Sequence, residues 1–529
     1  MVDHTAVSPS EPPAAQPSPA EVDRALRDAL DAREWPRAVA LIGEHWSLLL
    51  DEPGDLLDHA LHFVPVNAFD RDPRAAAVRD IRLHSSADAV DRMLGTATLP
   101  DADDLATLEN LARSERALSL VSVACARMIA LRVRGRMTRA LQLAVLVERL
   151  GRIAVVHQPA TVASRLPAAL LHTGITRGLA GDLPGALLAL RDAYERGPEA
   201  RGAHVLRDAA GKSALFLALD GDIEQARLWL DRHDRAPELS GWYRPRVALT
   251  ADVARAIVAT EALQADEAAT RVRMLDQPVN AEQSWGPTVT YARARHALAW
   301  GDRLGALDAL RIDRARYADW LGDDTTMAPL LAQAEVDLLL SLGQVRPALR
   351  LLDGQPDAPS TDALRARALL VEGDVADAER RAAAALGERM PTRLRIDALV
   401  THAVAKQRQS GAGAPDAASS DLRAAARERG LLLPLLGVPP EARAPFADML
   451  PPDHGARDVF RADPERIRIT PQQLVVLQGL ERRLTVREIA LRSHLSVNTV
   501  KSHARALYRR LEVSTRDEVV ARAYELGLL

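Results

Sequence analysis

The chain has 529 residues, a formal net charge of −4, 47% hydrophobic and 26% charged residues, and one cysteine, Cys125. This length and apolar content exclude a wholly disordered chain, and a single cysteine excludes an internal disulfide. No apolar run of about 18 residues and no basic-then-apolar start is present, so we expect neither a membrane span nor a secretory signal. These features predict a cytoplasmic protein that has no membrane partner.

Charge is unevenly distributed along the chain. Residues 464–529 contain 12 Lys and Arg against 7 Asp and Glu, a net of +5, and the remaining residues carry a net of −9. Because the total of −4 adds these two parts, it does not argue against a nucleic-acid partner. The basic C-terminal segment is where such a partner would bind.

The composition divides the chain into four segments. Residues 1–20 are rich in Pro, Ser and Ala and predict a disordered leader, since they have little apolar surface to offset the entropy of ordering. Residues 21–409 have apolar residues at three- and four-residue spacing, which predicts helix after helix. Residues 410–465 contain Gly-, Ser- and Pro-rich stretches around a short helical segment and are interpreted as a linker. Residues 466–529 form the last domain.

A repeat of about 40 residues runs through the helical region. Its sign is a glycine followed five residues later by alanine, and the pairs are Gly135–Ala140, Gly181–Ala186, Gly221–Ala226, Gly301–Ala306, Gly343–Ala348 and Gly373–Ala378. Leu263 and Ala268 form a degenerate copy. In this unit the glycine ends one helix with a positive φ, and the small alanine lets two helices approach closely. An aspartate after the glycine caps the next helix, at Asp182, Asp222, Asp302 and Asp374.

Helical hairpins of this kind cannot bury their apolar stripes alone. They stack on their neighbours, so the repeat predicts a superhelix with a concave groove. The pattern resembles tetratricopeptide-like arrays loosely, because the aromatic positions of that signature are mostly absent and the period is longer. An irregular all-α domain with hairpin turns is the alternative. Both interpretations predict an all-α fold, and the first is a helical-hairpin superhelix followed by a small four-helix domain.

Start signals predict four short helices after residue 466. Thr470-Pro471-Gln472-Gln473 is a capping box with proline in the first turn. Thr485 to Glu488 and Thr515 to Glu518 have the same box pattern, and Ser496 is placed to cap the third helix.

The second and third of these helices form a pair. They are expected at about 485–493 and 497–511, and the fourth is expected to stop at Gly527. The tight connection Ser493-His494-Leu495-Ser496 joins the second helix to the third, which is the layout of a helix-turn-helix.

The third helix has an apolar face and a polar face. At about 100° per residue, one side collects Val500, Ala504, Leu507 and Leu511, and the other collects Asn498, Lys501, Ser502, Arg505 and Arg509. Lys and Arg donate to guanine O6 and N7, Asn pairs with adenine, and Ser and Arg bind phosphate oxygens. Because the first turns of such a helix reach base edges, Lys501, Ser502 and Arg505 are the candidate base-reading residues.

This segment resembles the LuxR-type (GerE-like) DNA-binding domain of bacterial transcription regulators. The positions that match in order and spacing are Glu488-Ile489-Ala490, Leu495-Ser496, Thr499-Val500-Lys501, His503, Leu511, Val513, Thr515-Arg516 and Gly527-Leu528. The resemblance implies base contacts from Lys501, Ser502 and Arg505, phosphate contacts near Thr499 and Arg516, and dimerisation through the fourth helix. His503 is interpreted as a residue that abuts the DNA backbone or caps the core.

Four positions depart from the family pattern. They are Gln473, where an acidic residue is usual, Arg483 and Glu512, where glycine is usual, and Ser493, where an apolar residue is usual. These departures concern the geometry around the turn more than the fold.

Together these patterns predict a sequence-specific transcriptional regulator. Its helix-turn-helix reads promoter DNA as a homodimer and contacts RNA polymerase, and its helical array senses a ligand or a protein partner. The alternative is a helical-repeat interaction scaffold whose terminal domain does not bind DNA or only caps the array.

We expect no enzyme, cofactor or metal. Gly211-Lys212-Ser213 ends like a phosphate-binding loop, but Leu206 stands where its first glycine belongs and the surroundings are helical. The 14 histidines have no metal-ligand spacing, and no catalytic constellation is visible.

Overall fold

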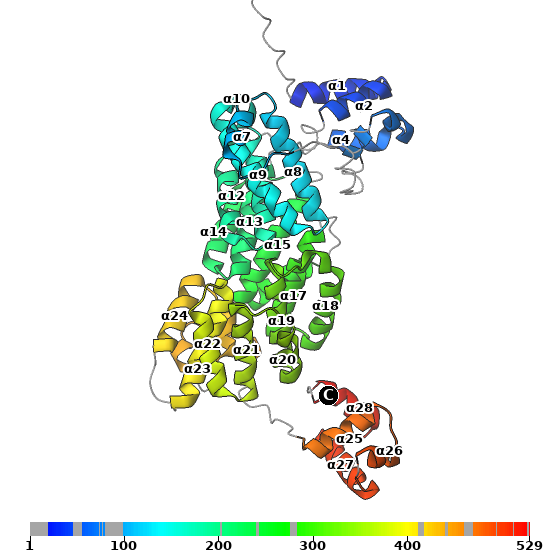
Figure 1. Ribbon diagram of the computed structural model, residues 1–529, viewed down its shortest axis with the longest axis vertical. Coiled ribbons are helices and arrows are strands. Elements are labelled where there is room, and N and C mark those ends of the chain that lie inside the picture. The colour runs from blue at the N-terminus through cyan, green and yellow to red at the C-terminus, as the bar shows by residue number, and fades with distance from the viewer. Residues whose placement is uncertain are drawn as a thin grey trace, which may run out of the picture. The chain divides into compact units, whose positions relative to one another are not determined.

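The computed structural model describes residues 19–45, 55–72, 75–76, 78–79, 99–200, 204–239, 243–275, 283–410, 417–439, 443–459, 469–493, 495–511, 513–525 and 528–529. Every regular element in these ranges is a helix (Figure 1), which confirms the predicted all-α fold. None of the described helices is long and apolar enough to cross a membrane. The predicted leader lies outside the described residues except for its last two positions.

The chain divides into two compact units. The first consists of residues 1–99 with 201–203 and 239–243, and the second contains the rest. The described helices of the first unit are α1 (Pro19–Asp31), α2 (Trp35–Glu44), α4 (Asp55–Phe63) and the 3₁₀ helix η1 (Val66–Arg71). Their buried core includes Leu26, Ile42, Leu57, Leu61 and Phe69.

The second unit begins with a long series of helices, which we call the array. Its α-helices are α7 (Leu105–Ala112), α8 (Ala117–Val133), α9 (Met137–His157), α10 (Pro159–Val162), α11 (Leu166–Leu179), α12 (Leu183–Glu195), α13 (His204–Asp220), α14 (Ile223–Arg235), α15 (Tyr243–Glu261), α16 (Ala265–Met274), α17 (Gly286–Ala299), α18 (Arg303–Arg316), α19 (Met327–Ser341), α20 (Val345–Asp353), α21 (Pro359–Glu372), α22 (Val375–Leu386), α23 (Thr392–Ser410) and α24 (Ala417–Arg429). The 3₁₀ helices are η2 (Gly197–Glu199), η3 (Gln283–Trp285), η4 (Ala318–Trp320), η5 (Leu433–Gly437) and η7 (Ala444–Phe446).

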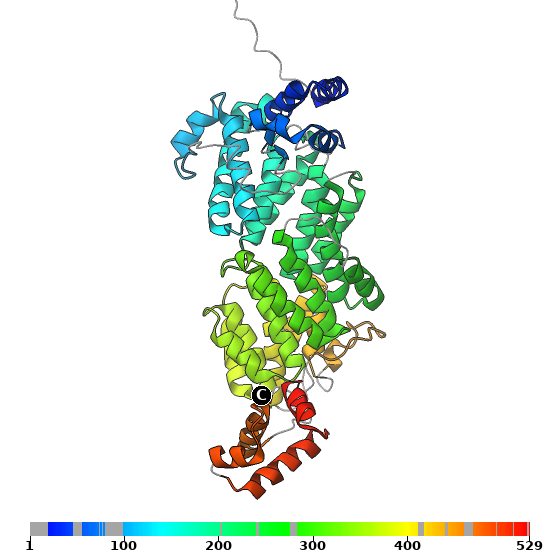
Figure 2. The same cartoon turned by 90° about the vertical axis from the view of Figure 1, so that its right-hand side faces the viewer.

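Neighbouring helices of the array pack as hairpins. The closest pairs are α8 with α9, α11 with α12, α13 with α14, and α21 with α22. The hairpins follow one another in chain order (Figures 1 and 2), and the first helices α17, α19, α21 and α23 pack in succession. One apolar core runs through them.

The repeat turn has the predicted conformation at most positions. A left-handed φ between +71° and +104° is found at Gly135, Gly181, Gly221, Gly343 and Gly373. The following amide closes the turn, as where the Asp222 amide donates to the Leu217 carbonyl. Leu263 adopts a φ of 57° in the degenerate copy, and Arg33, with a φ of 55°, precedes buried Ala38 by five residues in a copy without glycine. Gly301 does not have a positive φ, and its partner Ala306 is only half-buried.

The capping aspartates are confirmed. The Asp182, Asp222 and Asp374 carboxylates accept from backbone amides three residues later at 3.0–3.2 Å, and Asp302 accepts from the Leu304 and Gly305 amides. Each cap satisfies an amide that the helix itself leaves unpaired.

Residues 417–439 and 443–459 lie in the segment interpreted as a linker, and their buried apolar side chains belong to the core of the array. Leu431, Leu433, Leu435 and Leu436 are at most 1% exposed and share the apolar core of the array helices. Positions 411–416, 440–442 and 460–465 of that segment lie outside the described residues.

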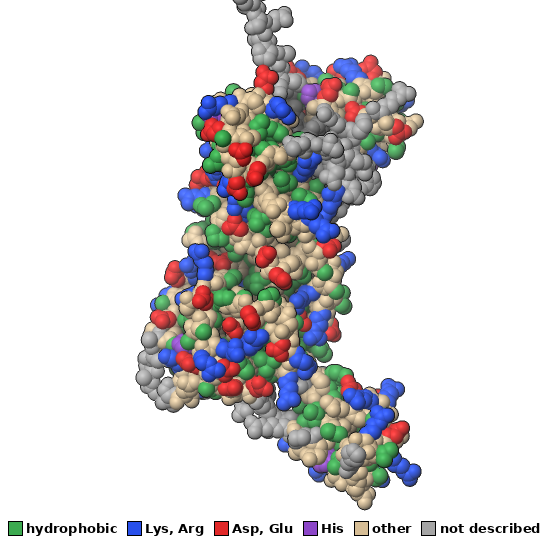
Figure 3. Space-filling view, viewed as in Figure 1, with side chains coloured by type: hydrophobic (Ala, Val, Ile, Leu, Met, Phe, Trp, Pro, Cys, Tyr) green, Lys and Arg blue, Asp and Glu red, His purple; other side chains and the backbone are tan. Residues whose placement is uncertain are grey.

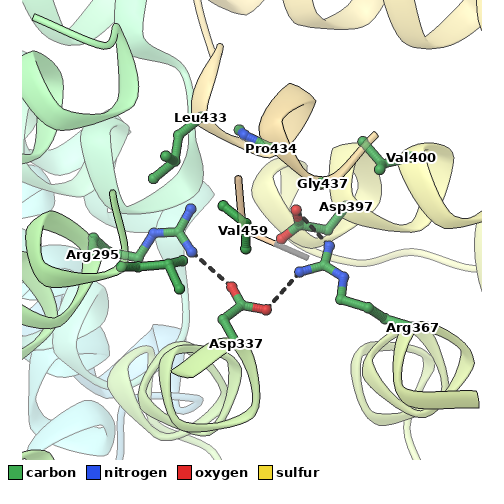
Figure 4. Close-up of a pocket in the computed structure, with 10 residues that line it drawn as sticks. Arg295, Asp337, Arg367, Asp397, Val400, Leu433, Pro434, Gly437 and Val459 are labelled. Carbon is green, nitrogen blue, oxygen red and sulfur yellow. Dashed lines mark hydrogen bonds and ion pairs between the residues drawn. The ribbon is translucent and has the colours of Figure 1, made fainter. Parts of the chain in front are cut away.

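A charge-balanced ion network lies inside the array (Figure 4). Arg295 on α17 pairs with Glu261 on α15 (Nε–Oε1, 2.9 Å) and with Asp337 on α19 (Nη1–Oδ2, 2.8 Å). Arg367 on α21 pairs with Asp337 at 2.7 Å and with Asp397 on α23 at 2.6 Å. All five side chains are at most 5% exposed. The network therefore links α15, α17, α19, α21 and α23 by ion pairs in the interior of the array, where water has little access.

Arg393 on α23 extends the network. Its guanidinium lies 2.6 Å from Glu261 Oε1 and donates to the carbonyl oxygens of Ala218 (2.7 Å) and Leu219 (3.3 Å) at the end of α13. Burial alone would raise the pKa of Glu261, but Arg295 and Arg393 hold that pKa below its ordinary value. Glu261 therefore stays ionised, and three arginines balance three carboxylates.

We expect Asp337→Ala to destabilise the array by about 3–5 kcal/mol, because it leaves Arg295 and Arg367 without a shared carboxylate in a buried site. Urea unfolding of the full chain, followed by circular dichroism, measures this loss. The control is Glu195→Ala, which removes the exposed Arg191–Glu195 pair (2.8 Å) and should cost under about 1 kcal/mol. Equal losses would contradict a special contribution from the network.

Buried polar side chains also occupy α13. Lys212, of the motif that resembles a phosphate loop, is 4% exposed, forms an ion pair with Asp208 on its own helix, and lies 5.3 Å from the Trp285 ring centroid. Burial lowers the pKa of nearby His204 to about 4, although Asp208 opposes the shift. Burial also lowers the pKa of His233 to about 4. Both imidazoles are therefore neutral at pH 7.

These histidines predict an acid-labile array. Their pKa is lower in the folded state than the ordinary 6.5, so the folded state binds fewer protons. The free energy of unfolding is therefore highest above pH 6.5. It declines as the pH falls toward 4, by about 3 kcal/mol for His204 alone. Melting temperatures between pH 7 and 4 measure the slope, and His204→Gln should reduce it. Parallel curves for this variant and the wild type would refute the assignment.

Candidate nucleic-acid interface

The C-terminal helices have a core of their own. They are α25 (Pro471–Glu481), α26 (Val486–Ser493), α27 (Val497–Arg510) and α28 (Arg516–Glu525). The buried side chains are Val476, Leu477, Leu480, Ile489, Ala490, Val500, Ala504, Leu507, Leu511, Val519 and Ala523. The helices lie where their start signals predict them, and the expected stop at Gly527 lies outside the described residues.

All four helix starts form the predicted caps. In α25 the Gln473 amide donates to Thr470 Oγ1 (3.2 Å), and the Thr470 amide donates to Gln473 Oε1 (2.9 Å). Gln473 thus completes the capping box without the usual carboxylate. The boxes before α26 and α28 are closed by Glu488 and Glu518, whose carboxylates accept from the amides of Thr485 (2.7 Å) and Thr515 (3.1 Å).

The connection between α26 and α27 is tight. The Leu495 amide donates to the Ala490 carbonyl (3.0 Å), and Ser496 Oγ accepts from the Thr499 amide (3.0 Å) at the start of α27. Ser493, which replaces a usual apolar residue, donates its hydroxyl to the Ile489 carbonyl of its own helix (2.6 Å). His494 lies outside the described residues. The Ser493 hydroxyl, the Leu495 amide and the Ser496 hydroxyl are therefore all paired despite the departure at Ser493.

The two faces of α27 are separated as predicted. Val500, Ala504 and Leu507 are buried in the domain core, and Leu511 follows them just after the helix. The opposite face is exposed and consists of Asn498, Lys501, Ser502, Arg505 and Arg509. At about 1.5 Å per residue, this face extends about 16 Å along the helix. We call these five residues the exposed face of α27.

The cations of this face, Lys501, Arg505 and Arg509, are exposed to solvent. Among the described residues, no carboxylate pairs with Lys501, Arg505 or Arg509, whereas arginines throughout the array are held in ion pairs. Figure 3 shows more basic than acidic side chains on the visible surface of this domain. Unpaired, solvated donors on one helix face are available to bind an external anion.

The remaining predicted site residues lie apart from this face. Thr499 is half-buried and its hydroxyl lies 2.7 Å from Ser496 Oγ, and His503 is half-buried on the flank of α27. Arg516 donates through Nε (2.9 Å) and Nη2 (2.7 Å) to the Leu480 carbonyl, so it holds α28 against the end of α25. The structure thus brings five of the eight predicted residues together on one exposed face.

Two backbone features support the domain. Arg483, where the family pattern has glycine, adopts a left-handed φ of 57°. The expected turn is therefore kept, at the cost of steric strain for a residue with a Cβ. Gly479 lies so close to α26 that a Cβ there would be 2.6 Å from Ile489 Cγ1. Sequence reasoning missed Gly479, although a glycine inside a helix is itself a sign of close packing.

Comparison with known families supports the interpretation of these four helices as a helix-turn-helix domain. Residues 468–523 match the family described as "GerE: Bacterial regulatory proteins, luxR family". No curated protein matches the chain. The match and the geometry together identify the C-terminal domain as a GerE-type helix-turn-helix and support a DNA-binding transcriptional regulator.

Relief of the strain at Arg483 should stabilise this domain. Arg483→Gly removes the clash of a left-handed Cβ, and we expect a gain of about 1 kcal/mol, or a melting temperature about 4–8 °C higher for a domain of this size. Thermal unfolding of the fragment 464–529 measures it. Arg482→Gly is the matched control, since Arg482 has a φ of −70° and glycine there should only destabilise. Similar shifts in both variants would contradict the strain.

Proposed function

We propose that the protein is a sequence-specific transcriptional regulator whose exposed face of α27 reads promoter DNA. The observation that carries this proposal is the row of exposed hydrogen-bond donors on the helix that follows the tight turn, whose cations form no ion pair within the described part of the chain. The major groove of B-DNA, about 12 Å wide, admits an α-helix. A helix with this face turned into the groove would place its donors against base edges and phosphates.

Each residue of the face has a proposed role from its place and chemistry. Lys501, Ser502 and Arg505 lie in the first turns of α27, from which helix-turn-helix proteins reach bases, so they would read base edges. Asn498 and Arg509 flank them. Thr499, His503 and Arg516 are proposed to lie near the DNA backbone, where Arg516 would use the guanidinium nitrogen that does not bond to Leu480.

We further propose that two copies bind together. In helix-turn-helix proteins, dimers read paired half-sites about one helical turn of DNA apart. The helix α28 would supply the dimer contact, and the bound dimer would contact RNA polymerase in the bacterial cytoplasm.

The array is proposed to be a tetratricopeptide-like superhelix that senses a ligand or a protein. Its stacked hairpins, left-handed turns and capping aspartates support this interpretation. The proposed domains are the leader 1–20, the repeat region 21–409, a connecting segment 410–465 and the DNA-binding domain 466–529.

Loss of base-reading side chains should weaken DNA binding. We expect Lys501→Ala and Arg505→Ala each to cost about 1–3 kcal/mol of binding free energy and to relax base preference, without loss of folding. Fluorescence anisotropy with a promoter fragment selected from the host genome measures the change. Arg510→Ala is the matched control, because Arg510 is exposed on the same helix but lies off this face, and its effect should be under twofold. Wild-type affinity in Lys501→Ala and Arg505→Ala would refute the assignment.

A DNA-binding experiment on the isolated fragment 464–529 distinguishes a DNA-binding regulator from an interaction scaffold. A DNA-binding domain shifts DNA and loses affinity steeply as salt rises, since its phosphate contacts release counterions. A fragment that folds but leaves DNA unshifted at low salt would favour the scaffold.

A further inference from the structure

An apolar segment that is not part of the helical hairpins covers the ion network. We call the described residues 431–439 and 443–459 the strap. Leu433, Pro434, Gly437 and Val459 of the strap line a small pocket whose other wall is formed by the network residues Arg295, Asp337, Arg367 and Asp397, with Leu298 and Val400 (Figure 4). The strap thus covers the face formed by α17, α19, α21 and α23.

Apolar side chains anchor the strap. Leu433, Leu435 and Leu436 are at most 1% exposed, and Phe446 and Val459 are 2% and 5% exposed. Short segments with a few fully buried apolar anchors are how peptides bind grooves on other proteins. The strap therefore has the anatomy of a bound peptide, although it belongs to the same chain.

The strap also pairs with helix ends. The Leu432 amide donates to the carbonyl of Glu261, the last residue of α15, at 2.9 Å, and the Arg457 amide donates to the carbonyl of Ala299, the last residue of α17, at 3.0 Å. Trp300 Nε1 donates to the His454 carbonyl (2.8 Å). Because the last carbonyls of a helix have no partner within it, these positions remain acceptors for any peptide that supplies amides there.

The ion pairs of the network join residues of the array helices to one another. The network arginines and carboxylates pair with one another, and within the strap Arg443 pairs with Asp458 (2.6 Å). Detachment would therefore expose apolar surface and break hydrogen bonds and the ion pairs of Asp448 with Arg423 and Arg427 on α24, but the ion pairs among the network residues would remain. This separates the strap from the helices that the network cross-links.

We propose that this face of the array is a peptide-binding surface, filled here by the strap. Its partner is a short leucine-rich segment with the chemistry of Leu431–Val438, which binds by displacing the strap. The proposal deepens the proposed sensing function of the array by naming its surface and its class of ligand, and it requires nothing of DNA.

The test is binding of a labelled synthetic peptide of residues 430–459 to the full-length chain, measured by fluorescence anisotropy. The strap competes in the wild type, so binding should be weak. Phe446→Ala removes an anchor from the strap but leaves the surface intact, and it should strengthen peptide binding at least tenfold. A scrambled peptide should not bind. Phe216→Ala, which removes a buried phenyl ring from α13, is the matched control and should give no gain.

A second variant and hydrogen exchange keep the test decisive if Phe446→Ala fails to fold. Trp300→Phe removes the donor to the His454 carbonyl and keeps a smaller aromatic ring at this position, and it should strengthen peptide binding at least threefold. In the wild type, the amides of Leu432 and Arg457 should exchange at least tenfold faster than those in the middle of α19, and added peptide should accelerate them further. Strap amides that exchange only with global unfolding, or variants that gain no peptide affinity, would overturn the proposal.

Discussion

Unpaired backbone groups at helix ends constrain this all-helical chain more than any other interaction. An α-helix leaves its first amides and last carbonyls without internal partners, and a chain built from many short helices has many such groups. Aspartates and capping boxes satisfy amides at several helix starts, such as those of α12, α14, α22 and α25. The carbonyls are satisfied by left-handed turns and by distant donors, and examples of such pairs are Trp320 Nε1 with Arg132 O, Thr326 Oγ1 with Gly178 O, Arg393 Nη2 with Ala218 O, Leu432 N with Glu261 O and Arg516 Nη2 with Leu480 O.

The ion network adds a second constraint on the array. A buried arginine or carboxylate is expensive unless its partner is in place, so the alternation of charges across α15, α17, α19, α21 and α23 disfavours any slip of one helix against the next. Arg393 joins the two constraints, since one guanidinium serves the Glu261 carboxylate and the carbonyls at the end of α13. Stacked hairpins with similar apolar stripes are thereby held in one arrangement.

Local features could be predicted from the sequence, and distant ones could not. The turns at Gly221 and its counterparts, the caps and the two faces of α27 depend on residues within a few positions, where helical geometry decides the outcome. Composition alone assigned 410–465 to a linker, because the partners of Leu432 and Arg457 lie more than 150 residues earlier. The bond of Arg516 to Leu480 was missed for the same reason. Of the candidate site, the exposed face of α27 was predicted, whereas the packing role of Arg516 was not.

The carbonyl groups at the ends of α15 and α17 also require hydrogen-bond donors from any segment that covers them. They only accept hydrogen bonds, so a segment laid across them must present an amide or another donor at each. Proline at position 432 would have no amide to donate. This edge of the array therefore discriminates by polarity as well as by shape, and sequences of equal hydrophobicity are not equivalent there.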